Sequence, residues 1–344
     1  MDDLDRQLLN RLQEQIPLVA RPFAALGAPL GLSEEQTLGR IRALKQPPNP
    51  IIRQISAIFD TKALGYQSSL VAAKMDPARV EQAASIINAH PGVTHNYERN
   101  HPYNLWYTVA VPPDSHFGME KTVDLLHRQT GAAVTRLFPT LRLYKIGVNF
   151  DLTGATDAAA RSEKPRFNEQ QRKTAMGFAV MAADKRMIRV LQQDLPIIAR
   201  PFDEWAEQAG VTVDELLAAV AGYQEQKRMR RFSAVLHHRQ AGFAANGMGA
   251  WSVPPEQHDS FGATAGTFSA VSHCYLRPTY EDWPYSIFTM VHGTSEADCH
   301  ATLAAISQAT SITDYAALFS TREFKKTRLK YFAGDIEAWE TAQA

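Results

Sequence analysis

Two short segments of the chain repeat one pattern of chemically active side chains. The first reads HNYER from His95 to Arg99, and the second reads HCYLR from His273 to Arg277. Alternate side chains of a β-strand lie on one face, so each segment predicts an imidazole, a phenol and a guanidinium side by side. Such a face is costly to bury unless something polar lies against it.

These residue types can bind carboxylates and transfer protons. Arginine stays charged and binds a carboxylate through two parallel hydrogen bonds, so Arg99 and Arg277 are candidate anchors. Histidine has an ordinary pKa of about 6.5 and can supply a proton near neutral pH, so His95 and His273 are the first candidates for general acids. The alternative is a solvated sheet face or an interface hydrogen-bond network, which the repetition makes less favoured. The same faces carry Tyr97 and Tyr275.

Further candidates lie near these segments in the sequence. His101 follows the first segment, and His238 comes directly before Arg239, so both histidines are second candidates for the acid. Lys62 occupies the position in the first copy that corresponds to Arg239. We interpret Lys62 and Arg239 either as carboxylate anchors or as solvated turn charges.

Aromatic residues provide flat apolar surface near the second segment. Tyr280 and Trp283 are candidates to line a pocket for a flat ligand, although aromatic residues at such spacings are more often core. His292 alternates with apolar neighbours on the next expected strand, and we interpret it as a satisfied core residue.

The two segments belong to an internal repeat that covers most of the chain. IPLVARPF at 16–23 matches LPIIARPF at 195–202, and VTHNYERN from Val93 matches VSHCYLRP from Val271 at nearly the same spacing. The second copy has an insertion that contains Tyr280, Asp282 and Trp283. Ordered matches of this kind predict two copies of one structural module.

Each copy predicts a helical unit followed by alternating strands and helices. The pairs Ser33/Gln36 and Thr212/Glu215 are capping boxes that begin the last helix of each unit. The β-β-α-β-β-α-β order that follows contains the βαββαβ of a ferredoxin-like sandwich. We therefore predict an α+β fold, a tandem repeat of a winged-helix-like helix-turn-helix domain and a ferredoxin-like domain.

The repeat and a polar stretch between its copies also predict domain bounds. We expect helix-turn-helix domains at 1–48 and 184–228, ferredoxin-like domains at 49–150 and 229–335, and a linker at 151–183.

The composition excludes several classes of protein. Lys+Arg and Asp+Glu both number 36, so the basic excess of a dedicated DNA-binding protein is absent. The two cysteines form no CxxC pair, so we expect neither a disulfide framework nor a metal site, and we interpret Cys274 as a buried free thiol. With neither a signal-peptide pattern nor an apolar run long enough to span a bilayer, we expect a cytoplasmic protein.

Longer motifs resemble known families. LDRQLLNRLQ and GLSEEQTLGRIRALK resemble the helix-turn-helix of the Lrp/AsnC regulator family. Nearly the whole chain resembles siroheme decarboxylase, a family of two related Lrp-like subunits. HNYERNHPYNLW is similar to one subunit type, and HHRQAGFAANGMGAW and SHCYLRPTYEDWPYSIFTMVHG are similar to the other. One departure is the acidic Glu98, where the second copy has Leu276.

The resemblance implies decarboxylation of the C12 and C18 acetate groups of siroheme to give 12,18-didecarboxysiroheme. It implies an intramolecular pseudo-heterodimer, which could form further oligomers. It also implies that the enzyme uses no organic cofactor. The iron belongs to the siroheme substrate. The product would serve heme d1 synthesis, towards which the fused arrangement leans, or heme synthesis by the alternative route.

Two other functions fit parts of the sequence. A transcription regulator would need two competent recognition helices, but the second copy has the acidic Asp214 and Glu215 where the first offers Arg40, Arg42 and Lys45. Specific DNA binding is therefore not expected. A non-catalytic heme-binding sensor would use the same Arg and His surface and stays open.

Overall fold

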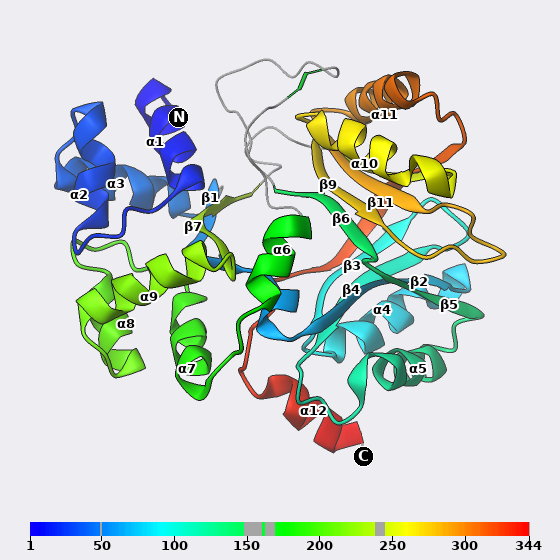
Figure 1. Cartoon of the computed structure of the whole chain (residues 1–344), viewed down its shortest axis with the longest axis horizontal. Coiled ribbons are helices and arrows are strands. Elements are labelled where there is room, and N and C mark those ends of the chain that lie inside the picture. Colours follow the sequence, from blue (N-terminus) through cyan, green and yellow to red (C-terminus); the bar gives the residue numbers. More distant parts are fainter. Residues whose placement is uncertain (49, 148–159, 162–168, 238–244, 344) are drawn as a thin grey trace. The chain divides into compact units, whose positions relative to one another are not determined.

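The computed structural model of the chain forms two compact units. The described residues are 1–48, 50–147, 160–161, 169–237 and 245–343. Among them, no helix is both long enough and apolar enough to cross a membrane. Figure 1 labels the helices and strands.

The first unit, residues 1–64 and 170–237 of the described chain, contains both helix-turn-helix-like domains. The predicted capping boxes are confirmed, because Ser33 accepts the N–H of Gln36 and Thr212 accepts that of Glu215. The helices are α1 (Asp3–Glu14), α2 (Pro22–Gly27) and α3 (Glu34–Lys45) in the first copy, then α6 (Glu169–Met176), α7 (Ala182–Leu191), α8 (Phe202–Ala209) and α9 (Val213–Glu225).

A two-stranded ribbon joins the two copies within this unit. Strands β1 (Ile52–Phe59) and β7 (Met229–Leu236) pair antiparallel with each other and not with the larger sheet. The Ile16 N–H donates to the Phe232 carbonyl at 2.8 Å, and the Leu195 N–H donates to the Ile55 carbonyl at 2.7 Å. These are the same contact made in opposite directions, so each helical domain is tied to the strand of the other copy. The domain bounds expected from the repeat stay a prediction.

The second unit is built on one nine-stranded sheet whose strand order is β5-β2-β4-β3-β11-β8-β10-β9-β6. The first four belong to copy 1 and are followed by four of copy 2, with β6 of copy 1 at the far edge. The strands are β2 (Gln67–Lys74), β3 (Val93–Arg99), β4 (Leu105–Val111), β5 (Val134–Pro139), β6 (Arg142–Ile146), β8 (Ala245–Trp251), β9 (Val271–Leu276), β10 (Ile287–Gly293) and β11 (Tyr315–Lys326).

Each copy shares its last strand with the other. The first part of β11 pairs with β8 of its own copy, and the rest pairs with β3 of copy 1. In copy 1 two separate strands make the corresponding pairings. Strand β5 pairs with β2 of its own copy, and β6 pairs with β9 of copy 2. The β-β-α-β-β-α-β order predicted from the sequence has a single strand at this place, so the prediction missed β5.

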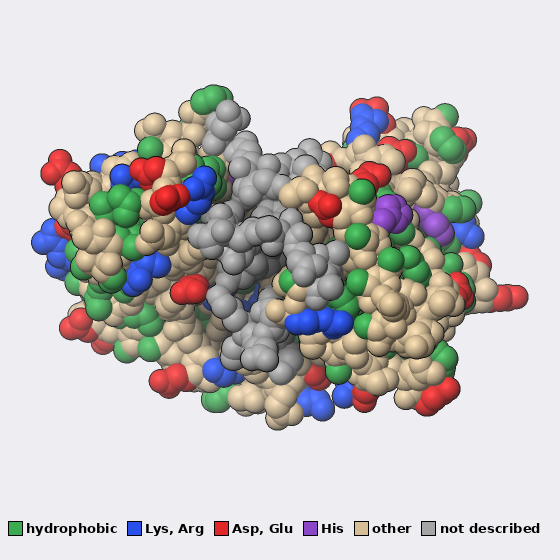
Figure 2. Space-filling model, turned by 90° about the horizontal axis from the view of Figure 1, so that it is seen from above, with side chains coloured by type: hydrophobic (Ala, Val, Ile, Leu, Met, Phe, Trp, Pro, Cys, Tyr) green, Lys and Arg blue, Asp and Glu red, His purple; other side chains and the backbone are tan. Residues whose placement is uncertain are grey.

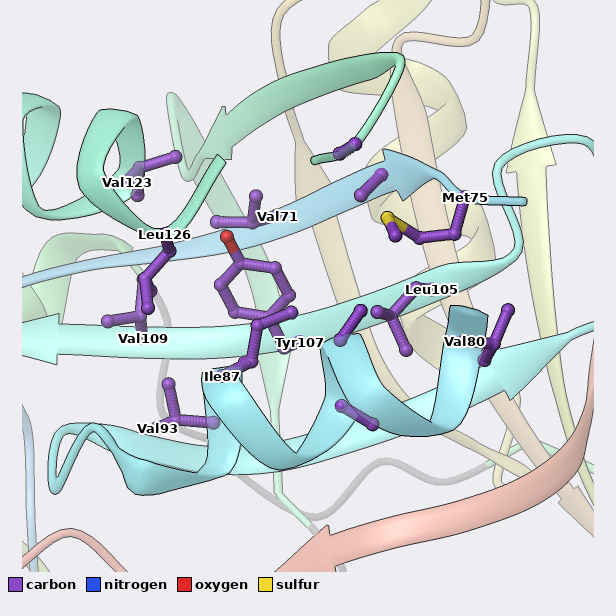
Figure 3. Close-up of a cluster of buried hydrophobic side chains, with 14 of the residues drawn as sticks. Val71, Met75, Val80, Ile87, Val93, Leu105, Tyr107, Val109, Val123 and Leu126 are labelled. Carbon is purple, nitrogen blue, oxygen red and sulfur yellow. The ribbon is translucent and has the colours of Figure 1, made fainter. Parts of the chain in front are cut away.

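Helices cover one face of each half of the sheet. Helices α4 (Val80–Ala89) and α5 (Gly118–Thr130) lie on copy 1, whereas α10 (His258–Thr267) and α11 (Glu296–Thr310) lie on copy 2 (Figure 1). Figure 3 shows the copy 1 core, in which Ile87 of α4 and Leu126 of α5 pack with Tyr107 and Val109 of β4. The predicted burial of the Cys274 thiol is confirmed in the copy 2 core.

A third core forms on the opposite face of the strands. On β4, Trp106 points away from the helices that cover Leu105 and Tyr107, as the period of two requires. Its cluster also contains Ala72, Tyr103 and Phe138 of copy 1 and Met248, Ala250, Trp283, Phe288 and Leu318 of copy 2. The helix-free faces of the two copies therefore pack against each other; we call this the inner core.

Shorter elements complete the chain. Helix α12 (Asp335–Gln343) lies at the C-terminal end, where Glu340 accepts the backbone N–H of His116 at 2.9 Å. The 3-10 helices are η1 (Ala28–Leu30), η2 (Lys62–Leu64), η3 (Pro77–Arg79) and η4 (Pro255–Gln257).

The ion pair between Arg172 of α6 and Asp60 generates a stability prediction. Its atoms are 2.9 Å apart and the side chains are 8% and 2% exposed. Removing one partner of a buried pair leaves a buried charge, so Arg172→Met should lower the free energy of unfolding by about 3–5 kcal/mol. Urea denaturation measures it. The pair Arg128–Asp124, 63% and 60% exposed, is the control, and Arg128→Met should change stability by about 1 kcal/mol or less. Equal effects would contradict the prediction.

Candidate active site

The two His-Tyr-Arg segments form the matching strands β3 and β9. The His95 and Tyr97 ring centroids are 6.1 Å apart, and those of His273 and Tyr275 are 5.8 Å apart. All four rings are half-buried. The neighbouring Asn96 points to the opposite face, towards the helices, where its amide donates to Asn88 of α4 at 3.0 Å. The structure thus confirms that the alternate side chains share the helix-free face.

The two arginines connect the copies. Arg99 donates to the Leu318 carbonyl of β11 at 3.0 Å, and Arg277 donates to the Phe138 carbonyl of β5. Both are nearly fully buried, and burial lowers the pKa of each guanidinium to about 10, which leaves it charged at neutral pH. Among the described residues, neither Nε has a hydrogen-bond partner. Each arginine therefore contributes to the cross-copy contact, and its role as a carboxylate anchor stays a prediction.

The insertion of copy 2 contributes aromatic side chains to the inner core. Tyr280 and Trp283 pair with each other in an isolated antiparallel β-bridge. The Tyr280 hydroxyl donates to the Leu137 carbonyl of copy 1. Trp283 is 1% exposed and lies 5.2 Å from the His101 ring, measured between centroids. Among the described residues, the indole N–H of Trp283 has no hydrogen-bond partner. The structure therefore brings His101, Tyr280 and Trp283 together around one aromatic cluster.

Asp282 of the insertion joins a charged cluster that the sequence reasoning missed. Its carboxylate accepts the Tyr103 hydroxyl at 2.7 Å and the Lys74 ammonium at 2.9 Å, and lies 3.3 Å from Nε of Arg136. The hydrogen bonds from Tyr103 and Lys74, with the charge of Arg136, lower the pKa of Asp282 to about 2. Only the insertion itself marked this place in the sequence, because Lys74 and Arg136 come from distant strands.

His101 lies beside this charged cluster. Its Nδ1 accepts the backbone N–H of Tyr103 at 3.1 Å. Burial, and then the charge of Lys74, lower the pKa of His101 below its ordinary value. A lowered pKa disfavours the protonated ring, so a smaller fraction of His101 carries a transferable proton than in an exposed histidine.

Three predicted residues are not placed in this arrangement. Lys62 belongs to η2 in the first unit, whereas the other placed candidates belong to the second. His238 and Arg239 lie outside the described residues.

The basic side chains of α3 already have protein partners. Arg40 donates to Asp2 and Asp5, at distances of 2.7–3.1 Å. Arg42 donates to the Ile197 carbonyl at 2.7 Å, and Lys45 pairs with Asp194 at 2.5 Å. Figure 2 shows basic and acidic side chains interspersed on the described part of the face it presents. DNA phosphates would have to compete with these internal contacts.

Comparison with known proteins identifies the family. A model of the AsnC-like ligand binding domain matches residues 63–145 and 240–325, and a model of the siroheme decarboxylase NirDL-like HTH domain matches 5–53 and 184–230. A siroheme decarboxylase of Hydrogenobacter thermophilus is 37% identical over 334 residues, which cover 97% of this chain and 96% of that protein. The chain belongs to the siroheme decarboxylase family.

Other members of the siroheme decarboxylase family are similar to the whole chain or to half of it. The crystal structure of siroheme decarboxylase NirDL in complex with an iron-uroporphyrin III analogue matches with a TM-score of 0.73 and 33% identity, over 98% of both chains. The siroheme decarboxylase alpha subunit of Desulfovibrio desulfuricans is 42% identical and covers 44% of this chain and 84% of that subunit. The beta subunit of the same organism is 38% identical over 43% of this chain and 94% of that subunit. The family resemblance and α+β fold expected from the sequence are confirmed.

The charged cluster generates a titration prediction. The pKa of Asp282 is lowered, so its carboxylate stabilises the cluster at pH values above about 4, the ordinary range for Asp. This contribution is lost as the pH falls through about 2. NMR titration of aspartate labelled at the carboxyl carbon should place the Asp282 midpoint near 2 and higher in Tyr103→Phe. Tyr285→Phe is the control and should leave the Asp282 midpoint unchanged, because the Tyr285 ring contacts Trp283 and not Asp282. A midpoint near 4 in the unaltered protein would refute the cluster.

Proposed function

We propose that this protein is a siroheme decarboxylase that removes CO2 from the C12 and C18 acetate groups of siroheme and gives 12,18-didecarboxysiroheme. The observation that carries the proposal is the doubled His-Tyr-Arg face, found in a chain that matches siroheme decarboxylase along 97% of its length. The product would serve heme d1 synthesis or heme synthesis by the alternative route. A cytoplasmic location stays a prediction.

The reaction needs a proton at each acetate. The bond between the acetate CH2 and its carboxylate breaks, CO2 leaves, and the electron pair stays on the CH2 carbon next to the pyrrole ring. A proton then converts that carbon into a methyl group, so two acetates consume two protons. We assign these protons to His95 and His273, which hold equivalent positions in the two copies.

Binding needs cations and a flat apolar surface. The buried guanidinium groups of Arg99 and Arg277 offer Nε donors towards substrate carboxylates, beside the half-buried rings of Tyr97 and Tyr275. Trp283 and Tyr280 offer apolar surface to the macrocycle. Lys62, His238 and Arg239 stay candidates from the sequence. We propose that no organic cofactor takes part, because the conjugated pyrrole ring can share the electron pair and the iron belongs to the substrate.

The two alternative functions separate on different observations. A transcription regulator is disfavoured, because Arg40, Arg42 and Lys45 are engaged within the protein and α9 begins with Asp214 and Glu215. A heme-binding sensor would bind the same tetrapyrrole and leave it unchanged, so turnover distinguishes it from the enzyme.

Turnover is the direct test of the function. Purified protein incubated anaerobically with siroheme should yield a product lighter by two CO2 units, measured by mass spectrometry against a heat-denatured control. Bound but unchanged siroheme would refute the enzyme and support the sensor.

Single substitutions test the two histidines. His95→Ala and His273→Ala should each block one decarboxylation and accumulate a product lighter by one CO2 unit, with a rate loss of about 10²-fold or more for the blocked step. His127→Ala is a control, because that ring bonds Thr135 on another strand. Full activity in both site variants would move the acid role to His101 or His238.

A further inference from the structure

The His273 ring lies at one end of a hydrogen-bonded chain of side chains in copy 2. Its Nδ1 is 2.7 Å from Oγ of Ser272, and that oxygen is 2.6 Å from Nε2 of His292 on β10. Nδ1 of His292 is in turn 2.5 Å from Oδ1 of Asn246 on β8. Three adjacent strands thus supply one chain that ends at the proposed acid.

The direction of each hydrogen bond follows from the Asn246 end. An amide oxygen only accepts, so Nδ1 of His292 must donate its proton to it. In a neutral imidazole the other nitrogen is then the acceptor, so Nε2 of His292 accepts the Ser272 hydroxyl proton. Ser272 has one proton, and its other acceptor, the Met290 carbonyl, is farther away at 3.3 Å. Oγ of Ser272 therefore accepts from His273, which requires a proton on Nδ1 of His273.

The surroundings of His292 keep its ring neutral. Burial is the main cause that lowers the pKa of His292, to about 4, and the positive charge of Lys326 on β11 adds to it. From β8 the ring meets the neutral Asn246, and from β9 it meets Ser272 and, through it, His273. At neutral pH His292 thus donates only through Nδ1, to Asn246, and its Nε2 accepts the hydroxyl proton of Ser272.

Copy 1 lacks this defined direction. Nδ1 of His95 is 3.0 Å from Oγ1 of Thr94, the counterpart of Ser272. Thr94 then meets the hydroxyl of Thr108 at 2.7 Å, and either oxygen can be the donor. A hydroxyl at this place accepts or donates equally well, so the bond does not fix which nitrogen of His95 carries the proton.

We propose that Ser272 and His292 are positioning residues that hold His273 with a proton on Nδ1 and make Nε2 the atom that exchanges protons with the substrate. This assignment rests on the proposed function of His273 as an acid. It makes the two copies unequal: one histidine has a fixed tautomer, whereas the other depends on its surroundings. The role is that of the group that orients a catalytic imidazole in many enzymes.

The tautomer of His273 tests the proposal directly. The protein labelled with ¹⁵N-histidine, in the absence of siroheme, should give an Nδ1–H signal that His273→Gln removes and thereby assigns. Ser272→Ala and His292→Leu should shift the ring towards the Nε2–H form that free histidine prefers. His292→Gln should retain the Nδ1–H form, because its amide oxygen can accept the Ser272 proton. Thr108→Val is the matched control in copy 1 and should leave His273 unchanged.

Single-turnover reactions with siroheme complete the test. One of the two decarboxylations is the one that His273→Ala blocks. His292→Leu should slow that step by about tenfold, a smaller rate loss than that of His273→Ala. His292→Gln should restore most of the rate. A His273 ring that is mainly Nε2–H in the unaltered protein, or that keeps its tautomer in His292→Leu, would overturn the positioning role. An intact reaction in His273→Ala would instead overturn the acid assignment within the proposed function, and the two failures are therefore distinguishable.

Discussion

The pairing of β11 with strands of both copies is the contact on which the rest of the structure depends. Its first part extends the sheet of copy 2, and its second part hydrogen-bonds to β3 of copy 1. The β5 and β6 strands make the reciprocal connection. This exchange brings the helix-free faces together and lets Arg99 and Arg277 reach the Leu318 and Phe138 carbonyls of the opposite copy. A polar face that would be costly in an isolated module thereby becomes the interior of a pseudo-dimer.

The two copies differ in the side chains that they place in this interior. The insertion of copy 2 places Asp282 against Lys74, Tyr103 and Arg136 of copy 1, and Trp283 in the inner core. On β10, His292 gives copy 2 an imidazole partner for Ser272. A duplicated module that binds an asymmetric macrocycle with two acetates to remove has a chemical reason to diverge in this way.

The helix-turn-helix-like domains connect the two copies within their unit. Within their unit, β1 pairs with β7, and each helical domain donates a backbone N–H to the strand of the other copy. The Arg42 and Lys45 side chains, which would face phosphate in a regulator, instead contact the Ile197 carbonyl and Asp194. A balanced charge suits such internal pairing, because cations used within the protein do not contribute to attraction for a polyanion.

The sequence by itself determined the repeat, the fold class, the capping boxes and the shared face of His95, Tyr97 and Arg99, because these follow from local periodicity and short spacings. Long motifs also determined the family. Only the tertiary structure decided that β1 leaves the larger sheet for β7, and that residues 134–139 form a strand that the sequence reasoning missed. It alone joined Asp282 to Lys74, and His292 to His273 through Ser272. Such contacts depend on which strands become neighbours, and strand pairing over long separations leaves no local pattern in the chain.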